Sequence, residues 1–193
     1  MTGRKRPRVL LAIAIAGLIA FGARAAAAPP GYKRSVVRYA VPDVVLVNQD
    51  GARVRLQSLT ESGKPVILDF IYGTCTTICP VLSAGYTSLQ GKLGADTRKM
   101  QLISISIDPE HDTPKVLKGY LKQYRAKPGW DFLTGSREDI DRVMKAFDSY
   151  ISDKMSHKQE TFIRGRSPGR WVRIKGLIGS AELMSEIAKA NKR

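Results

Sequence analysis

Two apolar runs of strand length dominate the hydrophobic pattern in the middle of the chain. Residues 65–72 (PVILDFIY) are almost continuously apolar, and residues 100–107 (MQLISISI) form a second run of similar length. Strands that are buried on both faces of a parallel sheet are typically rich in apolar side chains throughout. We therefore expect two buried strands that lie side by side, with their carboxyl ends at the same edge of the sheet.

Helical periodicity follows the second run. Thr113-Pro114 is a typical helix start, and apolar side chains recur at a spacing of three to four residues up to position 124. The other helices that we expect cover residues 78–92, 136–147 and 180–190. Shorter strands are expected at 44–47, 54–56, 131–133, 161–163 and 170–174, the first two joined as a hairpin by Asn48-Gln49-Asp50-Gly51. This alternation predicts an α/β fold with a layered sheet and an N-terminal β-hairpin.

The N-terminal segment has the pattern of an export signal. A basic stretch at residues 4–8 precedes an apolar run at 9–21, and small residues follow at 23–28. We expect residues 1–28 to be a signal peptide or an N-terminal membrane anchor, residues 29–42 a tether, and residues 43–193 a single domain. The domain would then be periplasmic or lie on the extracytoplasmic face of the membrane, where disulfides are permitted.

The basic charge of the chain is compatible with an exported globular domain. The formal net charge is +15, and five of the basic residues lie within residues 1–28. The remaining lysines and arginines are scattered and are not grouped with aromatic residues. We therefore expect a solvated basic surface that does not bind nucleic acid but could favour a membrane surface or an acidic partner.

The candidate chemistry lies in the two cysteines of the chain, Cys75 and Cys79. We expect Cys79 in the first turn of the helix that follows the first buried strand, Cys75 in the preceding loop, and Thr77 as the helix cap. Unpaired amides at a helix N-terminus stabilise a thiolate, which favours both metal binding and disulfide exchange. A structural disulfide is the alternative, but a bridge across five residues would contribute little stability.

Two histidines could complete a metal site with the thiols. His111 lies in a polar loop before a helix, where a solvent-facing role is expected. His157 lies in the loop before the closing strand pair, which would return it toward the cysteine edge. Asp108 and Asp112 are expected to serve in turns and capping, with Asp112 or Thr113 as the helix cap. Met155 could offer a thioether, although we expect it to be packed.

Three motifs resemble the Sco/SenC family over roughly residues 40–190. They are DFIYGTCTTICPVLS, LISISIDPEHDTPKVLKGYLKQY, and a histidine before a short strand. The resemblance implies a thioredoxin-like fold that binds copper, as Cu(I) or Cu(II), through Cys75, Cys79 and His157. It also implies a role in metallating or reducing the binuclear copper site of cytochrome c oxidase. The implied partner is an oxidase subunit or another periplasmic copper or thiol protein, with association at the membrane.

The sequence departs from the family pattern in several places, among them the uncharged residues 76–78 between the cysteines and Arg164-Gly165-Arg166 in the following strand. Thr76 stands where the family commonly has proline, and Ser156 stands where an aspartate usually precedes the histidine and supports it. Copper-binding assembly remains the leading hypothesis. The alternative is a periplasmic thiol–disulfide oxidoreductase without a copper-transfer role, in which Cys75 attacks and Cys79 resolves the mixed disulfide. A passive binding module with a structural disulfide is the third hypothesis.

Overall fold

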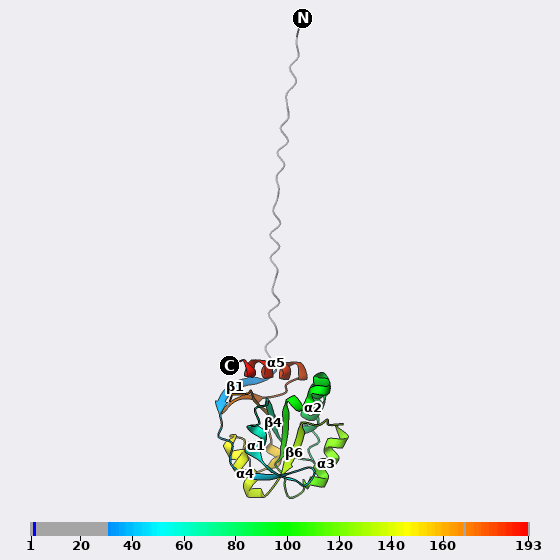
Figure 1. Cartoon of the computed structure of the whole chain (residues 1–193), viewed down its shortest axis with the longest axis vertical. Coiled ribbons are helices and arrows are strands. Elements are labelled where there is room, and N and C mark those ends of the chain that lie inside the picture. Colours follow the sequence, from blue (N-terminus) through cyan, green and yellow to red (C-terminus); the bar gives the residue numbers. More distant parts are fainter. Residues whose placement is uncertain (1, 3–30, 168, 193) are drawn as a thin grey trace.

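The computed structural model describes residue 2, residues 31–167 and residues 169–192 (Figure 1). The predicted signal or anchor therefore lies outside the described residues, apart from residue 2. Within the described part of the chain, none of the helices is both long enough and apolar enough to span a bilayer.

A mixed eight-stranded sheet forms the centre of the protein. Its strand order is β1-β8-β7-β4-β5-β6-β2-β3, in which β4, β5 and β6 are parallel and the other pairs are antiparallel. The strands are β1 (Lys33–Arg38), β2 (Val45–Asn48), β3 (Arg53–Arg55), β4 (Val66–Ile71), β5 (Gln101–Ser106), β6 (Trp130–Thr134), β7 (Glu160–Arg164) and β8 (Arg170–Lys175). The two apolar runs of the sequence are the adjacent central strands β4 and β5, as predicted, and β2 and β3 form the predicted hairpin.

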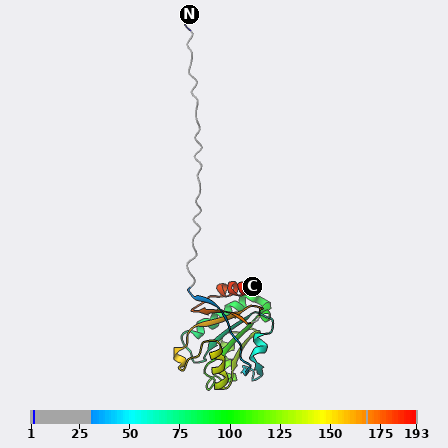
Figure 2. The same ribbon diagram turned by 90° about the vertical axis from the view of Figure 1, so that its left-hand side faces the viewer.

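The helices cover the two faces of this sheet. They are α1 (Leu56–Thr60), α2 (Cys79–Leu93), α3 (Pro114–Gln123), α4 (Arg137–Ala146) and α5 (Ser180–Asn191), with 3₁₀ turns η1 (Gly94–Lys99) and η2 (Lys154–Ser156). The side chain of Thr113 caps α3, which confirms Thr113 over Asp112 as the cap of this helix. In Figures 1 and 2, α5 lies across the end of the sheet beside β1, where Arg34 pairs with Glu186.

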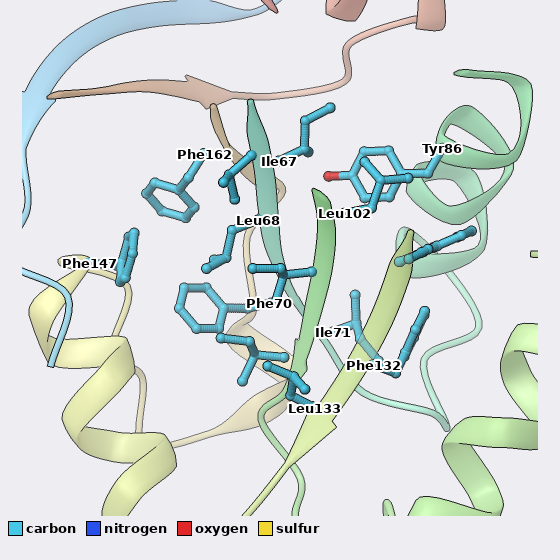
Figure 3. Close-up of a cluster of buried hydrophobic side chains, with 14 of the residues drawn as sticks. Ile67, Leu68, Phe70, Ile71, Tyr86, Leu102, Phe132, Leu133, Phe147 and Phe162 are labelled. Atoms are coloured by element: carbon cyan, nitrogen blue, oxygen red, sulfur yellow. The ribbon is translucent and has the colours of Figure 1, made fainter. Parts of the chain in front are cut away.

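Apolar side chains on both faces of β4 form the core. Figure 3 shows Phe70 of β4 on the side of Phe147 at the end of α4, whereas Ile71 points to the side of α2, which carries Tyr86. The rings of Phe70 and Phe147 meet edge to face, with centroids 6.1 Å apart. Because β4 is buried along its whole length, its carboxyl end and the loop after it are held firmly in place.

The structure corrects one part of the predicted domain organisation. Residues 33–38 lie within the expected tether, but they form β1, which pairs with β8 from Lys33 opposite Lys175 to Arg38 opposite Arg170. The proline and glycine signals that indicated a tether end at Gly31, just before this strand. Backbone pairing with a strand about 135 residues away in the sequence has no local signal.

A buried carboxyl group interrupts the apolar strand β4. Asp69 is completely buried and lies on the same face as α2. Its Oδ1 accepts a hydrogen bond from Ser104 at 2.6 Å, while its Oδ2 has no partner among the described residues. Burial raises the pKa of Asp69 to about 7, which outweighs the hydrogen bonds that favour the carboxylate. The folded protein therefore retains a proton that the unfolded chain releases at a much lower pH.

This buried proton predicts a specific pH dependence of stability. Between about pH 4 and pH 7 the folded state binds more protons than the unfolded chain, so the free energy of unfolding falls as the pH rises. Asp69→Asn removes this effect, and its stability relative to wild type should rise across that window by up to about 4 kcal/mol. Urea unfolding at pH 4 to 8 under reducing conditions measures the difference.

The matched control is Asp43→Asn, which removes an exposed carboxylate paired with Arg55. A difference between Asp69→Asn and wild type that stays constant from pH 4 to pH 8 would contradict the assignment of a buried proton.

Candidate dithiol site

The two cysteines lie at the carboxyl end of β4, as the sequence predicts. Cys79 is the first residue of α2, and Cys75 lies in the preceding loop. Both are free thiols, but Cys75 is only 5% exposed and Cys79 is 0% exposed. Cys75 is therefore less accessible than we expected, although its neighbours at positions 74, 76 and 77 in the loop are exposed.

The start of α2 points its amides at Cys75. The amide of Cys79 donates to Cys75 Sγ at 3.4 Å. The prediction that Thr77 caps the helix is wrong: Ile78 is the N-cap, without a side-chain cap, and the Thr77 hydroxyl lies 3.7 Å from Cys75 Sγ. The sulfur of Cys75 thus accepts hydrogen bonds from groups that a capping side chain would otherwise have engaged.

These contacts give the two thiols opposite properties. Burial disfavours a thiolate at Cys75, but hydrogen bonds from the Cys79 thiol and from the amides of residues 77–79 prevail and lower the pKa of Cys75 to about 6. Burial, and then the hydrogen bond to Cys75, raise the pKa of Cys79 well above its ordinary value. Near neutral pH the pair is therefore a thiolate at Cys75 that is stabilised by a protonated Cys79.

Tyr72 connects the dithiol to the loop that carries the histidine. Burial, and then the interaction with Cys75, raise the pKa of Tyr72 to about 12, so its hydroxyl keeps its proton and donates a hydrogen bond to Met155 Sδ at 3.8 Å. The Tyr72 ring faces His157 edge-on, with ring centroids 6.4 Å apart, and Lys154 Nζ lies 5.7 Å from the same ring. The sequence analysis missed Tyr72, because an aromatic residue at the end of an apolar strand is typical of a core position.

His157 lies against the same strand end. Its Nε2 is 2.8 Å from the carbonyl oxygen of Phe70, and because a carbonyl only accepts hydrogen bonds, Nε2 carries the proton. Burial lowers the pKa of His157, which favours the neutral ring. The Nδ1 lone pair is then the one that can bind a metal. The Phe70 carbonyl thus orients the His157 ring by accepting its proton in a hydrogen bond. An aspartate at position 156 could have had this role, but Ser156 stands there.

The structure brings the two thiols together but does not gather all three predicted ligands. Among residues 31–167 and 169–192, no group of three or more His, Cys, Asp or Glu side chains has an arrangement that could hold a metal ion. His157 as a ligand therefore stays a prediction. His111 lies in a solvent-facing loop, as expected, and its Nδ1 is 2.9 Å from Asp108 Oδ1.

The aspartates of the loop after β5 position the site. The predicted alternative of an Asp112 cap is wrong, because Asp112 Oδ2 accepts the Gly73 amide at 2.9 Å and also binds the Ser106 hydroxyl. A Cβ at position 73 would lie 2.6 Å from Asp112 Oδ1, so any larger residue would displace this carboxyl group. Asp108 binds Lys154 Nζ at 2.5 Å and so holds η2 near the dithiol. Both aspartates orient backbone segments and make no hydrogen bond to a cysteine.

Comparison with known proteins identifies the family. The model of the SCO1/SenC family matches residues 38–190. A SCO1 protein homolog of Bacillus subtilis is 37% identical over 137 residues, which are 67% of this chain and 70% of that protein. The mitochondrial SCO1 homolog of Homo sapiens is 29% identical over 103 residues, which are 52% of this chain and 34% of that protein.

Solved structures show the same fold. A structure of BsSco, described as having a disulfide switch and as a member of the Sco family of cytochrome c oxidase assembly proteins, has a TM-score of 0.66. It is 32% identical, and the alignment covers 80% of this chain and 94% of that one. Bradyrhizobium japonicum ScoI with copper bound has a TM-score of 0.65 at 25% identity, covering 78% of this chain and 99% of that one. These likenesses confirm the predicted α/β, thioredoxin-like fold. By the family match and the fold, the chain belongs to the SCO1/SenC family.

Proposed function

We propose that this protein binds copper as cargo through Cys75, Cys79 and His157, and that it metallates or reduces the binuclear copper site of a respiratory oxidase. The observation that carries the proposal is the pair of adjacent sulfurs at the start of α2, one of them a stabilised thiolate. The relation to a Sco family member described as a cytochrome c oxidase assembly protein, and to a ScoI with copper bound, supports the same function.

The donor set fits copper in its reduced state. Thiolates are soft ligands and suit Cu(I), whereas the neutral imidazole of His157 suits either oxidation state. Cys75 is already a thiolate near neutral pH, but Cys79 has to lose its proton before it can bind the metal. Copper uptake should therefore release close to one proton from the dithiol.

The proposal includes where the protein acts and which kind of protein accepts the copper. The export pattern of residues 1–28 supports a periplasmic or extracytoplasmic domain that is associated with the membrane. There the acceptor would be an oxidase subunit or another protein with a copper or thiol site. The basic surface of the domain favours an acidic partner or an anionic membrane.

Copper binding should depend on all three proposed ligands. The reduced protein, titrated anaerobically with Cu(I) and Cu(II) against a chromophoric chelator, should bind one copper per chain. Cys75→Ser or Cys79→Ser should abolish tight binding, and His157→Ala should weaken it by about 10–100-fold because the third ligand is lost. His111→Ala is the matched control. The proposal is rejected if wild type does not bind copper tightly, or if His157→Ala binds as wild type does.

A second candidate function is thiol–disulfide exchange. It is favoured by the difference between the two thiols, since the pKa is lowered at Cys75 and raised at Cys79. A thiolate at Cys75 can attack a partner disulfide and release one partner thiolate. The deprotonated Cys79 would then attack the sulfur of Cys75, release the second partner thiolate and form the Cys75–Cys79 disulfide. The described disulfide switch of BsSco, at 32% identity, supports redox chemistry at this position.

The asymmetry of the thiols predicts their reactivity as a function of pH. Alkylation of the reduced protein with iodoacetamide should modify Cys75 with a rate that reaches half its maximum near pH 6, since only the thiolate reacts. In Cys75→Ser, Cys79 should react slowly throughout the range from pH 5 to 9. Mass spectrometry of the alkylated peptides measures both rates. Equal reactivity of the two cysteines, or a Cys75 midpoint above pH 8, would exclude the described hydrogen-bond pattern.

The Cys79→Ser variant distinguishes disulfide exchange from copper binding, because only disulfide exchange predicts a trapped mixed disulfide. If the protein exchanges disulfides, Cys79→Ser should accumulate mixed disulfides on Cys75 with an oxidised partner, because the resolving thiol is absent. Copper-free Cys79→Ser, incubated with oxidised acceptor peptide and analysed by non-reducing electrophoresis, tests this. Cys75→Ser is the control and should trap none. If Cys79→Ser traps no acceptor either, the oxidoreductase function is refuted while copper binding is unaffected.

A further inference from the structure

A methionine lies exposed at the rim of the dithiol site. The side chain of Met155, in η2, is 73% exposed, more than any other large apolar side chain in the described part of the chain. This corrects the expectation that Met155 is packed. The hydrophobic effect gives no reason for this position, because burying an apolar side chain is favourable.

The turn that presents Met155 is anchored on both sides. The amide of Met155 donates to Asp153 Oδ1 at 2.9 Å, and Lys154 binds Asp108. On the other side, His157 is held by the carbonyl of Phe70. The backbone that carries the thioether is therefore held beside Tyr72, while the thioether itself is mostly exposed to solvent.

One hydroxyl group separates Met155 from the dithiol. The Tyr72 hydroxyl donates a hydrogen bond to Met155 Sδ at 3.8 Å, and the neighbouring Cys75 contributes to the raised pKa of Tyr72. Tyr72 thus neighbours both the exposed thioether of Met155 and the buried sulfur of Cys75. His157 contacts the ring of Tyr72 and is itself partly buried, so the thioether is the more accessible soft donor.

We propose that Met155 is the receiving ligand of the site: its thioether takes up Cu(I) from a donor in solution and passes it to Cys75 and Cys79. This inference rests on the proposed copper function. Thioethers are soft and neutral, and they suit Cu(I) without having to lose a proton. Because Cys75 and Cys79 are buried, an ion that approaches from solvent meets the thioether first.

The transfer needs no oxidant or reductant. Cu(I) leaves its donor ligand and binds Met155 Sδ as the hydrogen bond from the Tyr72 hydroxyl to that sulfur breaks, and the Cys75 thiolate then binds the same ion. Cys79 loses its proton to water and forms the second copper–thiolate bond, and the bond to Met155 is released. Copper stays Cu(I) throughout, and the net change is the gain of one Cu(I) and the loss of one proton.

The test compares loading rates with final occupancy. Stopped-flow absorbance follows the transfer of Cu(I) from its bathocuproine complex to the reduced protein. Met155→Leu should load at least about tenfold more slowly than wild type, in the range seen when a supporting residue of a metal site is removed. Its final copper occupancy should be unchanged. The control is Met184→Leu in α5, which should load at the wild-type rate.

A second measurement detects the intermediate directly. In the Cys79→Ser variant, Cu(I) cannot form the dithiolate and binds only weakly, so at saturating Cu(I) the ion should lie between Cys75 and Met155. The methyl resonance of Met155 in ¹³C-methionine-labelled protein should then shift on addition of Cu(I), and that of Met184 should not.

The outcomes separate this inference from the function on which it rests. If wild type takes up Cu(I) but Met155→Leu loads as fast, or the Met155 methyl resonance does not shift, the receiving role is overturned and the copper function stands. If wild type takes up no Cu(I), both are overturned.

Discussion

The site depends on the hydrogen bonds that the sulfur of Cys75 accepts. The donors are the amides at the start of α2 and the Cys79 thiol. Helix N-termini carry unpaired amides and a partial positive charge, and a buried sulfur placed there is stabilised as a thiolate. Without these donors, burial alone would keep both cysteines protonated. A protonated pair would be a poor copper ligand and a slow nucleophile, so both candidate functions rest on this contact.

The rest of the fold holds this contact in place from three directions. Strand β4 delivers the loop from a fully buried position, and Asp112 fixes Gly73 at the start of that loop. The turn η2 lies over Tyr72, where Asp108 and the Phe70 carbonyl anchor it. These contacts therefore hold the dithiol in a buried position at the carboxyl end of β4.

The sequence predicts the parts of the site that local patterns encode. An apolar run followed by Cys75 and Cys79 indicates a strand-to-helix junction, and the structure has that junction. Tyr72 acts through its hydroxyl, and its sequence context resembles that of any core tyrosine. The pairing of Gly73 with Asp112, or of β1 with β8, joins residues far apart in the chain and leaves no periodic signal. Local sequence patterns therefore predict most helices and strands. Contacts between residues far apart in the chain can be seen only in the three-dimensional structure.

X-ray absorption spectroscopy of the anaerobically Cu(I)-loaded protein tests the central claim most directly, because it reports the atoms bound to copper. The account predicts two sulfur ligands and one nitrogen ligand in wild type, and the loss of the nitrogen when His157 is replaced by alanine. A copper surrounded only by nitrogen and oxygen, or two sulfur ligands that survive replacement of both cysteines by serine, would contradict it.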